Sequence, residues 1–111
     1  MIEKTIANYL SANAAYPWKA MRPKTVSVDK YGLFEKTNSQ GHHLFTSVFA
    51  FQSFAPTLQE AIEVSDDLKE TIFEMVELDE VISVELQNEY NFTDTATKQP
   101  RYQAVFTIMH Y

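Results

Sequence analysis

Cysteine is absent from the sequence, and glycine and proline are scarce, with two and four residues in a chain of 111. Without thiols the chain cannot form a disulfide framework, a thiolate zinc site or a cysteine nucleophile. The N-terminus lacks the basic and then apolar layout of a signal peptide, and the longest apolar runs are only strand-sized. We therefore expect a soluble protein that is made and kept inside the cell, with no membrane partner.

Motifs that are specific to one type of reaction are also missing. The sequence contains no glycine-rich phosphate-binding loop, no serine in a nucleophile elbow and no aspartate in a pattern that would orient a catalytic histidine. His42 and His43 are adjacent and His110 is the third histidine, so a metal site would need carboxylates that the sequence does not place. The acids of residues 60–80 follow helical spacing rather than the spacing of a calcium loop. We predict no enzymatic activity, no cofactor and no metal.

What the chain does contain is enough apolar material for one core. Hydrophobic residues make up 45% of it and aromatic residues 14%, which predicts a single domain over residues 1–111.

The net charge of -6 argues against general affinity for nucleic acid. Residues 1–59 hold six Lys/Arg and three Asp/Glu, a net of +3, and residues 60–111 hold three and twelve, a net of -9. Such a dipolar chain can dock head to tail on its own copies, or the acidic half is a solvated helix face.

Apolar periodicity predicts two helices. In residues 1–16, Ile2, Ile6 and Leu10 recur at helical spacing, and Pro17 ends the helix. Within residues 55–78, Thr57 and Glu60 form a capping box. The apolar stripe of this second helix comprises Ala61, Ser65, Leu68, Ile72, Met75 and Val76, widened by Ile62 and Phe73. The opposite, acidic face comprises Glu63, Asp66, Asp67, Glu70, Glu74 and Glu77. This pattern is typical of an amphipathic helix that lies on a sheet.

Alternating apolar residues predict four strands, over residues 24–31, 43–55, 81–90 and 101–111. Glycines and polar residues predict turns and a loop over 32–43, and a polar loop over 91–100. The third strand should point Ile82, Val84 and Leu86 inward. The element order indicates an α+β fold, with a mostly antiparallel sheet of about four strands, an N-terminal helix and one long amphipathic helix packed on it.

The last strand needs a partner, and we expect it to pair with residues 81–87 of the same subunit. Its outer face then presents Val105 and Met109 as surplus apolar area, which is consistent with a subunit contact; alternatively, the strand is central and covered on both sides. The polar loops 35–43 and 91–99 are further candidate contacts. The remaining candidate subunit contacts are Trp18, Arg22, Lys24, His42, His43 and Arg101. Trp18 has the alternative role of a core residue, and the two histidines that of exposed loop residues.

The arrangement resembles the small tail-terminator proteins of long-tailed bacteriophages, also called tail-completion or minor capsid proteins of the head-to-tail connection. The resemblance covers residues 16–111. It rests on the connector "YPWKAMRPKTVSV", the phrase "TSVFAFQSFAPTLQEAIEVSDDLKETI" and the ending "PRYQAVFTIMH". The segment "DKYGLFEKTNSQG" departs from that pattern, because it carries fewer glycines than is usual there.

The resemblance implies a structural protein of the virion, without catalysis. Such proteins assemble in the bacterial cytoplasm into a ring, commonly a hexamer, which caps the tube of major tail protein and joins it to the head connector proteins. DNA passes through the ring without specific binding, and an acidic lumen would let it slide; the acidic helix face is the candidate lining. A small module that binds a ligand or a peptide on its sheet is the alternative function.

Overall fold

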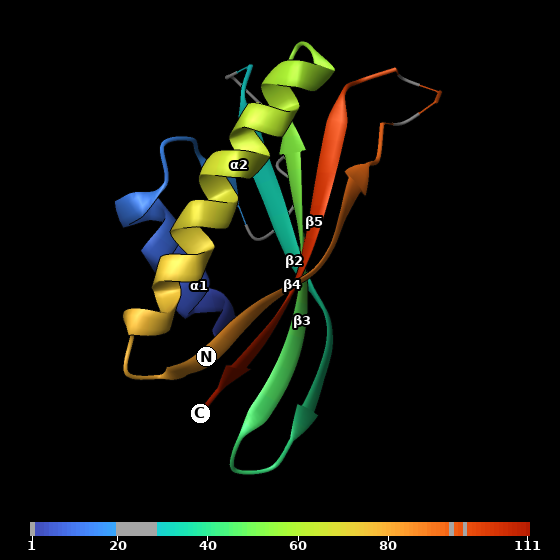
Figure 1. Ribbon diagram of the computed structural model, residues 1–111. Coiled ribbons are helices and arrows are strands. Elements are labelled where there is room, and N and C mark those ends of the chain that lie inside the picture. Colours follow the sequence, from blue (N-terminus) through green and yellow to red (C-terminus); the bar gives the residue numbers. More distant parts are fainter. Residues whose placement is uncertain (1, 20–28, 94, 97) are drawn as a thin grey trace.

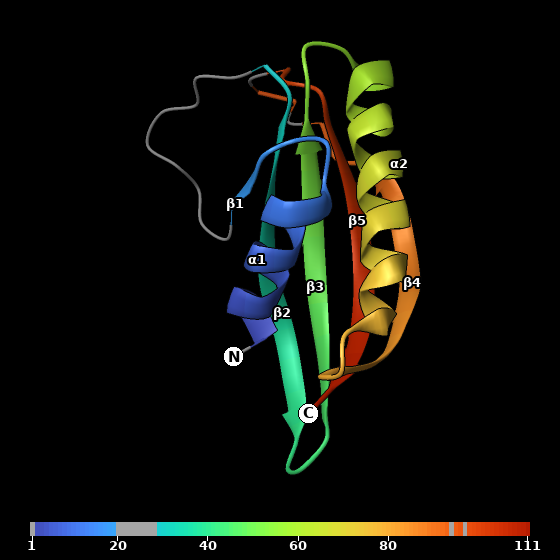
Figure 2. The same ribbon diagram turned by 90° about the vertical axis from the view of Figure 1, so that its left-hand side faces the viewer.

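The computed structural model describes residues 2–19, 29–93, 95–96 and 98–111. Its elements are α1 (Ile2–Asn13), β1 (Trp18–Lys19), β2 (Tyr31–Gly41), β3 (Phe45–Phe54), α2 (Leu58–Glu74), the short 3-10 helix η1 (Met75–Glu77), β4 (Val81–Asn91) and β5 (Arg101–His110). The sheet has the strand order β1-β2-β3-β5-β4, and both helices lie on one of its faces (Figures 1 and 2). All neighbouring strands are antiparallel except β1 and β2. The predicted α+β fold with a mostly antiparallel sheet is confirmed, and β1 is an additional short strand.

The core lies between the two helices and the central strands β3 and β5. Phe49, Phe51 and Phe106 have no exposed surface, and they alternate along their strands because every second side chain of a strand points to the same face. The helices cover these rings with Ile6 of α1 and Leu68 of α2, which are also fully buried. The helix-facing side of the sheet is therefore the apolar side that the alternation in the sequence predicts.

The α2 helix begins at Thr57, as the capping box predicts. The Thr57 hydroxyl accepts a hydrogen bond from the Glu60 main-chain N–H at 3.2 Å and donates one to the Glu60 carboxylate at 2.9 Å. The buried stripe is rotated from the predicted one. Phe73 and Val76 are 44% and 45% exposed, and the buried residues of the stripe are Ala61, Val64, Ser65, Leu68, Thr71, Ile72 and Met75. The sequence cannot distinguish these two flanks, because both carry apolar side chains.

Replacing Thr57 with alanine should lower the free energy of unfolding by about 1 kcal/mol, the usual cost of a lost N-cap. Hydrogen bonds from Thr57 and then from Lys30 lower the pKa of Glu60 below its ordinary value of 4.5. A lowered carboxyl pKa contributes stability above the ordinary value, and this contribution is lost as the pH falls through the lowered one. Urea denaturation should thus show a larger gap between wild type and Thr57→Ala at neutral pH than in acid; an equal gap at both would contradict the capping box.

Trp18 lies in the core, so its prediction as a subunit contact is wrong and its alternative role as a core residue holds. Its side chain is 8% exposed, and its ring meets Phe51 edge to face with 6.0 Å between the centroids. The parallel pairing of β1 with β2 places Trp18 opposite Gly32, where a Cβ would overlap the indole ring. Gly32 therefore serves close packing rather than the turn predicted for it.

Residues 31–41 form strand β2, so the prediction of turns and a loop over 32–43 is wrong except at its end. The strand pairs with β3 from Tyr31 to Gly41, with a bulge between Lys36 and Asn38. Its second half is exposed on both faces, so the apolar alternation that identifies a strand is missing. Gly41, at a φ of 132°, leads into the turn. The first predicted strand, over 24–31, falls largely outside the described residues, as do Arg22 and Lys24.

The last strand, β5, pairs with β4 inside the subunit, which confirms the predicted partner. It also pairs along its whole length with β3, so it is central in the sheet.

The inward orientation of Ile82 was predicted wrongly. Bulges interrupt the β4–β5 register between Val81 and Ser83 and again after Leu86, so the phase of alternation shifts. Val81 is buried and Ile82 is 37% exposed at the sheet edge.

Candidate subunit interface

The outer sheet face, opposite the helices, carries an apolar patch at its centre. In the β3–β5 register, Ala50 lies opposite Val105, Val48 opposite Thr107 and Thr46 opposite Met109. We call Val48, Ala50, Val105, Thr107 and Met109 the outer patch; Ala50 is buried among its neighbours, and the other four side chains are partly exposed. No described helix covers it (Figure 1). The solvent face of an antiparallel sheet is normally polar. Val105 and Met109 lie on this face, as predicted, and apolar side chains in such a place are typical of a protein contact.

A row of aromatic and amide side chains borders the outer patch. Gln52 donates to Gln103 at 2.9 Å, and Gln103 donates to the Tyr90 hydroxyl at 2.6 Å. Arg101, a predicted contact, donates from Nε to the Phe92 main-chain oxygen at 2.8 Å. Its guanidinium carbon lies 4.5 Å from the centre of the Phe92 ring, within reach of a cation–π contact. These contacts hold Arg101 as a fixed cation at one end of the patch.

The acidic face of α2 is largely exposed, but not all of its members are free. The Asp67 carboxylate accepts a hydrogen bond from the main-chain N–H of Ala15 at 3.0 Å and so ties α2 to the end of α1. Lys69 bridges Asp66 at 3.2 Å and Glu89 of β4 at 2.8 Å, and the hydrogen bond with Glu89 raises the pKa of Lys69. The members without such contacts among the described residues are the exposed Glu63, Glu70, Glu74 and Glu77. The part of the acidic face that could repel the phosphates of DNA is therefore smaller than the sequence suggests.

The β2–β3 hairpin extends past the end of the helix layer, and its turn carries the two predicted contact histidines (Figure 2). His42 and His43 are exposed, with ring centroids 4.6 Å apart, and Leu44 beside them is 46% exposed. In the described part of the chain, no group of three His, Asp or Glu residues could hold a metal ion. The histidines are thus presented to solvent or to a partner protein.

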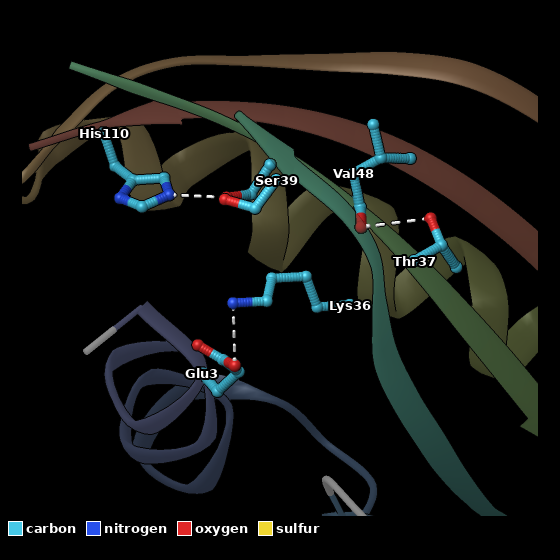
Figure 3. A network of polar contacts seen from close by, with 7 residues as sticks. Glu3, Lys36, Thr37, Ser39, Val48 and His110 are labelled. Atoms are coloured by element: carbon cyan, nitrogen blue, oxygen red, sulfur yellow. Dashed lines mark hydrogen bonds and ion pairs between the residues drawn. The ribbon is translucent and has the colours of Figure 1, made fainter. Parts of the chain in front are cut away.

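A chain of two serine hydroxyls and one imidazole links the hairpin to the end of β5 (Figure 3). Its members Ser47 and His110 are buried, and Ser39 is exposed. The Ser39 and Ser47 hydroxyl oxygens lie 2.9 Å apart, and Ser47 Oγ lies 2.7 Å from His110 Nε2. His110 Nδ1 lies 3.1 Å from the Tyr111 main-chain oxygen, and Phe45 stacks on the imidazole with 5.6 Å between the ring centroids. With Nδ1–H donating to that oxygen, Nε2 accepts the Ser47 proton, and Ser47 accepts one from Ser39.

A serine bonded to a histidine also occurs in nucleophilic catalysis, but this pair is closed to substrate. Ser47 has no exposed surface and His110 is 6% exposed. The imidazole is held between the Ser47 hydroxyl and the Tyr111 main-chain oxygen, and the buried Ser47 hydroxyl bonds onward to Ser39. The pair is a structural connection that the sequence analysis missed. The signal was present, because Ser47 is in phase with Phe49, and His110 with Ile108, on the buried face.

Replacing Ser47 with alanine should cost about 1 to 3 kcal/mol, because it leaves the buried His110 Nε2 without a hydrogen bond. Ser53 supplies a matched control, since it lies on the same face of β3 and is also fully buried, and its hydroxyl has no partner among the described residues. Ser53→Ala should leave the urea midpoint unchanged or raise it. Equal losses in both variants would mean that the Ser47–His110 bond contributes nothing.

The surroundings of Trp18 bear on the alternative of a ligand-binding module. Trp18 borders a hollow of about 320 Å³ together with Leu10 of α1 and Tyr16 of the segment that follows α1. Its indole N–H is buried and has no partner among the described residues, so it does not reach the surface of the hollow. The core phenylalanines cannot form a pocket on the sheet, because side chains of the two helices pack against them.

No known protein family and no curated protein matches the chain. Of the helices in the described residues, none has the length and apolar character needed to cross a membrane.

Proposed function

We propose that the protein is a structural subunit of a ring, the tail terminator that caps the tail tube of a long-tailed bacteriophage and joins it to the head connector. The single observation that carries this proposal is the outer patch, an apolar surface on the face of the sheet that no described helix covers. Catalysis or the binding of a small ligand does not by itself require such a surface. A protein that functions only when packed against other proteins of an assembly does require one.

The distribution of charge supports the same proposal. The first half of the chain forms α1, β1, β2 and β3, and nearly all of α2, with β5 and β4, comes from the second half. Among the described residues, the first half carries four Lys/Arg and three Asp/Glu, and the second half carries three Lys/Arg and eleven Asp/Glu, so the excess of acid lies in α2, β4 and β5 and the segments between them. Because two such acidic surfaces repel each other, heterologous contacts, which close into rings, are favoured over twofold ones.

In such a ring, the exposed acids of α2 would line the passage for DNA and repel its phosphates. Because Asp67 binds the end of α1, the useful test omits it and changes Glu63, Glu70 and Glu74 to glutamine. The fold should be unchanged or slightly more stable, since like charges at helical spacing cost a few tenths of a kcal/mol per pair, roughly. Ring assembly should persist while DNA delivery falls. Lost assembly with a folded subunit would make the face a docking surface, and unchanged infectivity would make it merely solvated.

The proposal is tested against a ligand-binding module by the solution mass of the purified protein over a concentration series. A ring subunit should give a single closed oligomer, whereas a small binding module should remain a monomer. A monomer at every concentration, or an open series of increasing masses, would count against the ring.

A further inference from the structure

Among the described residues, two edges of the sheet have no pairing strand in the half that lies nearest the hairpin turn. The β4 strand is the terminal strand on one side. On the other side, β1 pairs only with Gly32 and Leu33, and no other described residue pairs with the outer edge of β2. Residues 81–88 of β4 and 35–41 of β2 are at the same level, because both ranges are in register with the same stretches of β3 and β5. Free edges carry unpaired main-chain donors and acceptors and readily accept another strand.

Exposed apolar side chains gather beside the free edge of β4. Phe73 and Val76 lie on the flank of α2 and η1, and Ile82 lies at the bulge of β4 itself. The Phe73 ring centroid is 5.4 Å from that of Phe106, which is in register with Leu86 of β4. The edge therefore offers apolar contact area in addition to main-chain hydrogen bonds.

The topology fixes the direction of a pairing between copies. The β2 strand is antiparallel to β3, β3 to β5 and β5 to β4, so β4 runs opposite to β2 within one subunit. A rotation about an axis parallel to the strands keeps every strand direction. The β4 edge of one copy would then meet the β2 edge of the next in antiparallel orientation and at the same level. Asn38, Val48, Thr107 and Glu85 form one row across the sheet, which such a ring would continue from copy to copy.

We propose that adjacent copies in the ring pair β4 with β2 in this way, so that one continuous sheet joins the subunits. This inference rests on the proposed function and adds the surface through which copies meet. It assigns the outer patch to the tail tube or the connector rather than to the next copy. The bulges after Val81 and Leu86 limit the regular part of the contact to residues 83–86.

Charge favours this heterologous contact over a twofold pairing of two β4 edges. A β4–β4 contact would bring two Glu85 side chains together. The β4–β2 contact instead places Glu85 beside the uncharged Asn38 of the next copy. Like charges disfavour an interface, and the β4–β2 contact avoids this repulsion.

The absence of cysteine makes a direct test possible. Asn38 and Glu85 are exposed, and each is changed to cysteine in a separate variant. A disulfide forms when the two Cα atoms are about 4.4 to 6.8 Å apart. The expected result is a cross-linked dimer in a mixture of Asn38→Cys and Glu85→Cys and none with either alone. A chain carrying both cysteines should give a ladder that ends at one closed species. Gln59→Cys, exposed at the start of α2, measures chance collisions.

Each other outcome overturns the inference in a recognisable way. Cross-linking of Glu85→Cys alone would show a twofold β4–β4 contact. A discrete oligomer by mass with no cross-link above the Gln59→Cys control would place the contact elsewhere while the proposed function stands. A monomer at every concentration would remove both the edge contact and the ring.

Discussion

Replacing Gly32 with alanine should destabilise the protein by about 1 to 3 kcal/mol, a large effect for a single methyl group. The new Cβ would overlap the six-membered ring of Trp18 and force the indole away from Phe51. In an ordinary strand position, the same change stabilises slightly, because glycine loses more backbone freedom on folding. The sign of the effect therefore reports on the contact between Gly32 and Trp18.

Trp18→Ala provides the control for this prediction. Alone it should cost about 3 to 5 kcal/mol, as expected for a large aromatic removed from a core. In that background, Gly32→Ala should cost almost nothing, because the ring it would strike is gone. Urea denaturation of both single variants and the double variant completes the thermodynamic cycle. Additive losses would mean that Gly32 is needed for its backbone conformation and not for the packing of Trp18.

Under the proposed function, changing Val105 and Met109 together to glutamate should abolish capping of the tail tube while the subunit stays folded. Both side chains are partly exposed on the outer patch, and a partner that completes their burial would gain about 1 to 2 kcal/mol from them. Losing this contribution weakens the contact roughly 10-fold, and two buried carboxylates would weaken it further.

The readouts for this variant are the urea midpoint, the solution mass and the binding to tail tubes. If β4 and β2 join the copies, the variant keeps its ring mass and loses only the tube. Loss of the ring itself would place the outer patch between copies. The matched control is Gln59→Glu, which adds one charge at an exposed site far from the patch. Unchanged capping by the double variant would remove the outer patch from the interface.

Much of the fold could be predicted because the central elements repeat a simple period. Alternation along residues 45–54 and 101–110 reflects strands with one face on the core, and the capping pair Thr57 and Glu60 marks the start of α2. The partner of the last strand followed from the same pattern. Local signals were sufficient wherever one face of an element is buried and the other is not.

The second half of β2 could not be predicted, because it is exposed on both faces and its polar side chains read as a loop. The position of Trp18 depends on a glycine 14 residues further along the chain, which no local pattern connects to it. Ile82 was misplaced because a bulge shifts the phase of β4. These features are set by register between strands, and register is a property of the folded sheet.

The candidate interface divides in the same way. Val105 and Met109 could be placed on the outer face by counting along one strand. Their union with Val48 and Ala50 into one patch required the pairing of β3 with β5. The acidic face of α2 was visible as a helical period, but the hydrogen bond that engages Asp67 joins it to α1 across the fold. The free edges of β2 and β4 became visible only with the strand order.

Electron microscopy of tail tubes, assembled from the tail-tube protein of the proposed phage with and without this protein, shows whether the protein terminates tubes. We expect a ring at one end of each tube in its presence and tubes that no longer lengthen. Bare tubes of unregulated length in the presence of the folded protein would contradict the proposed function.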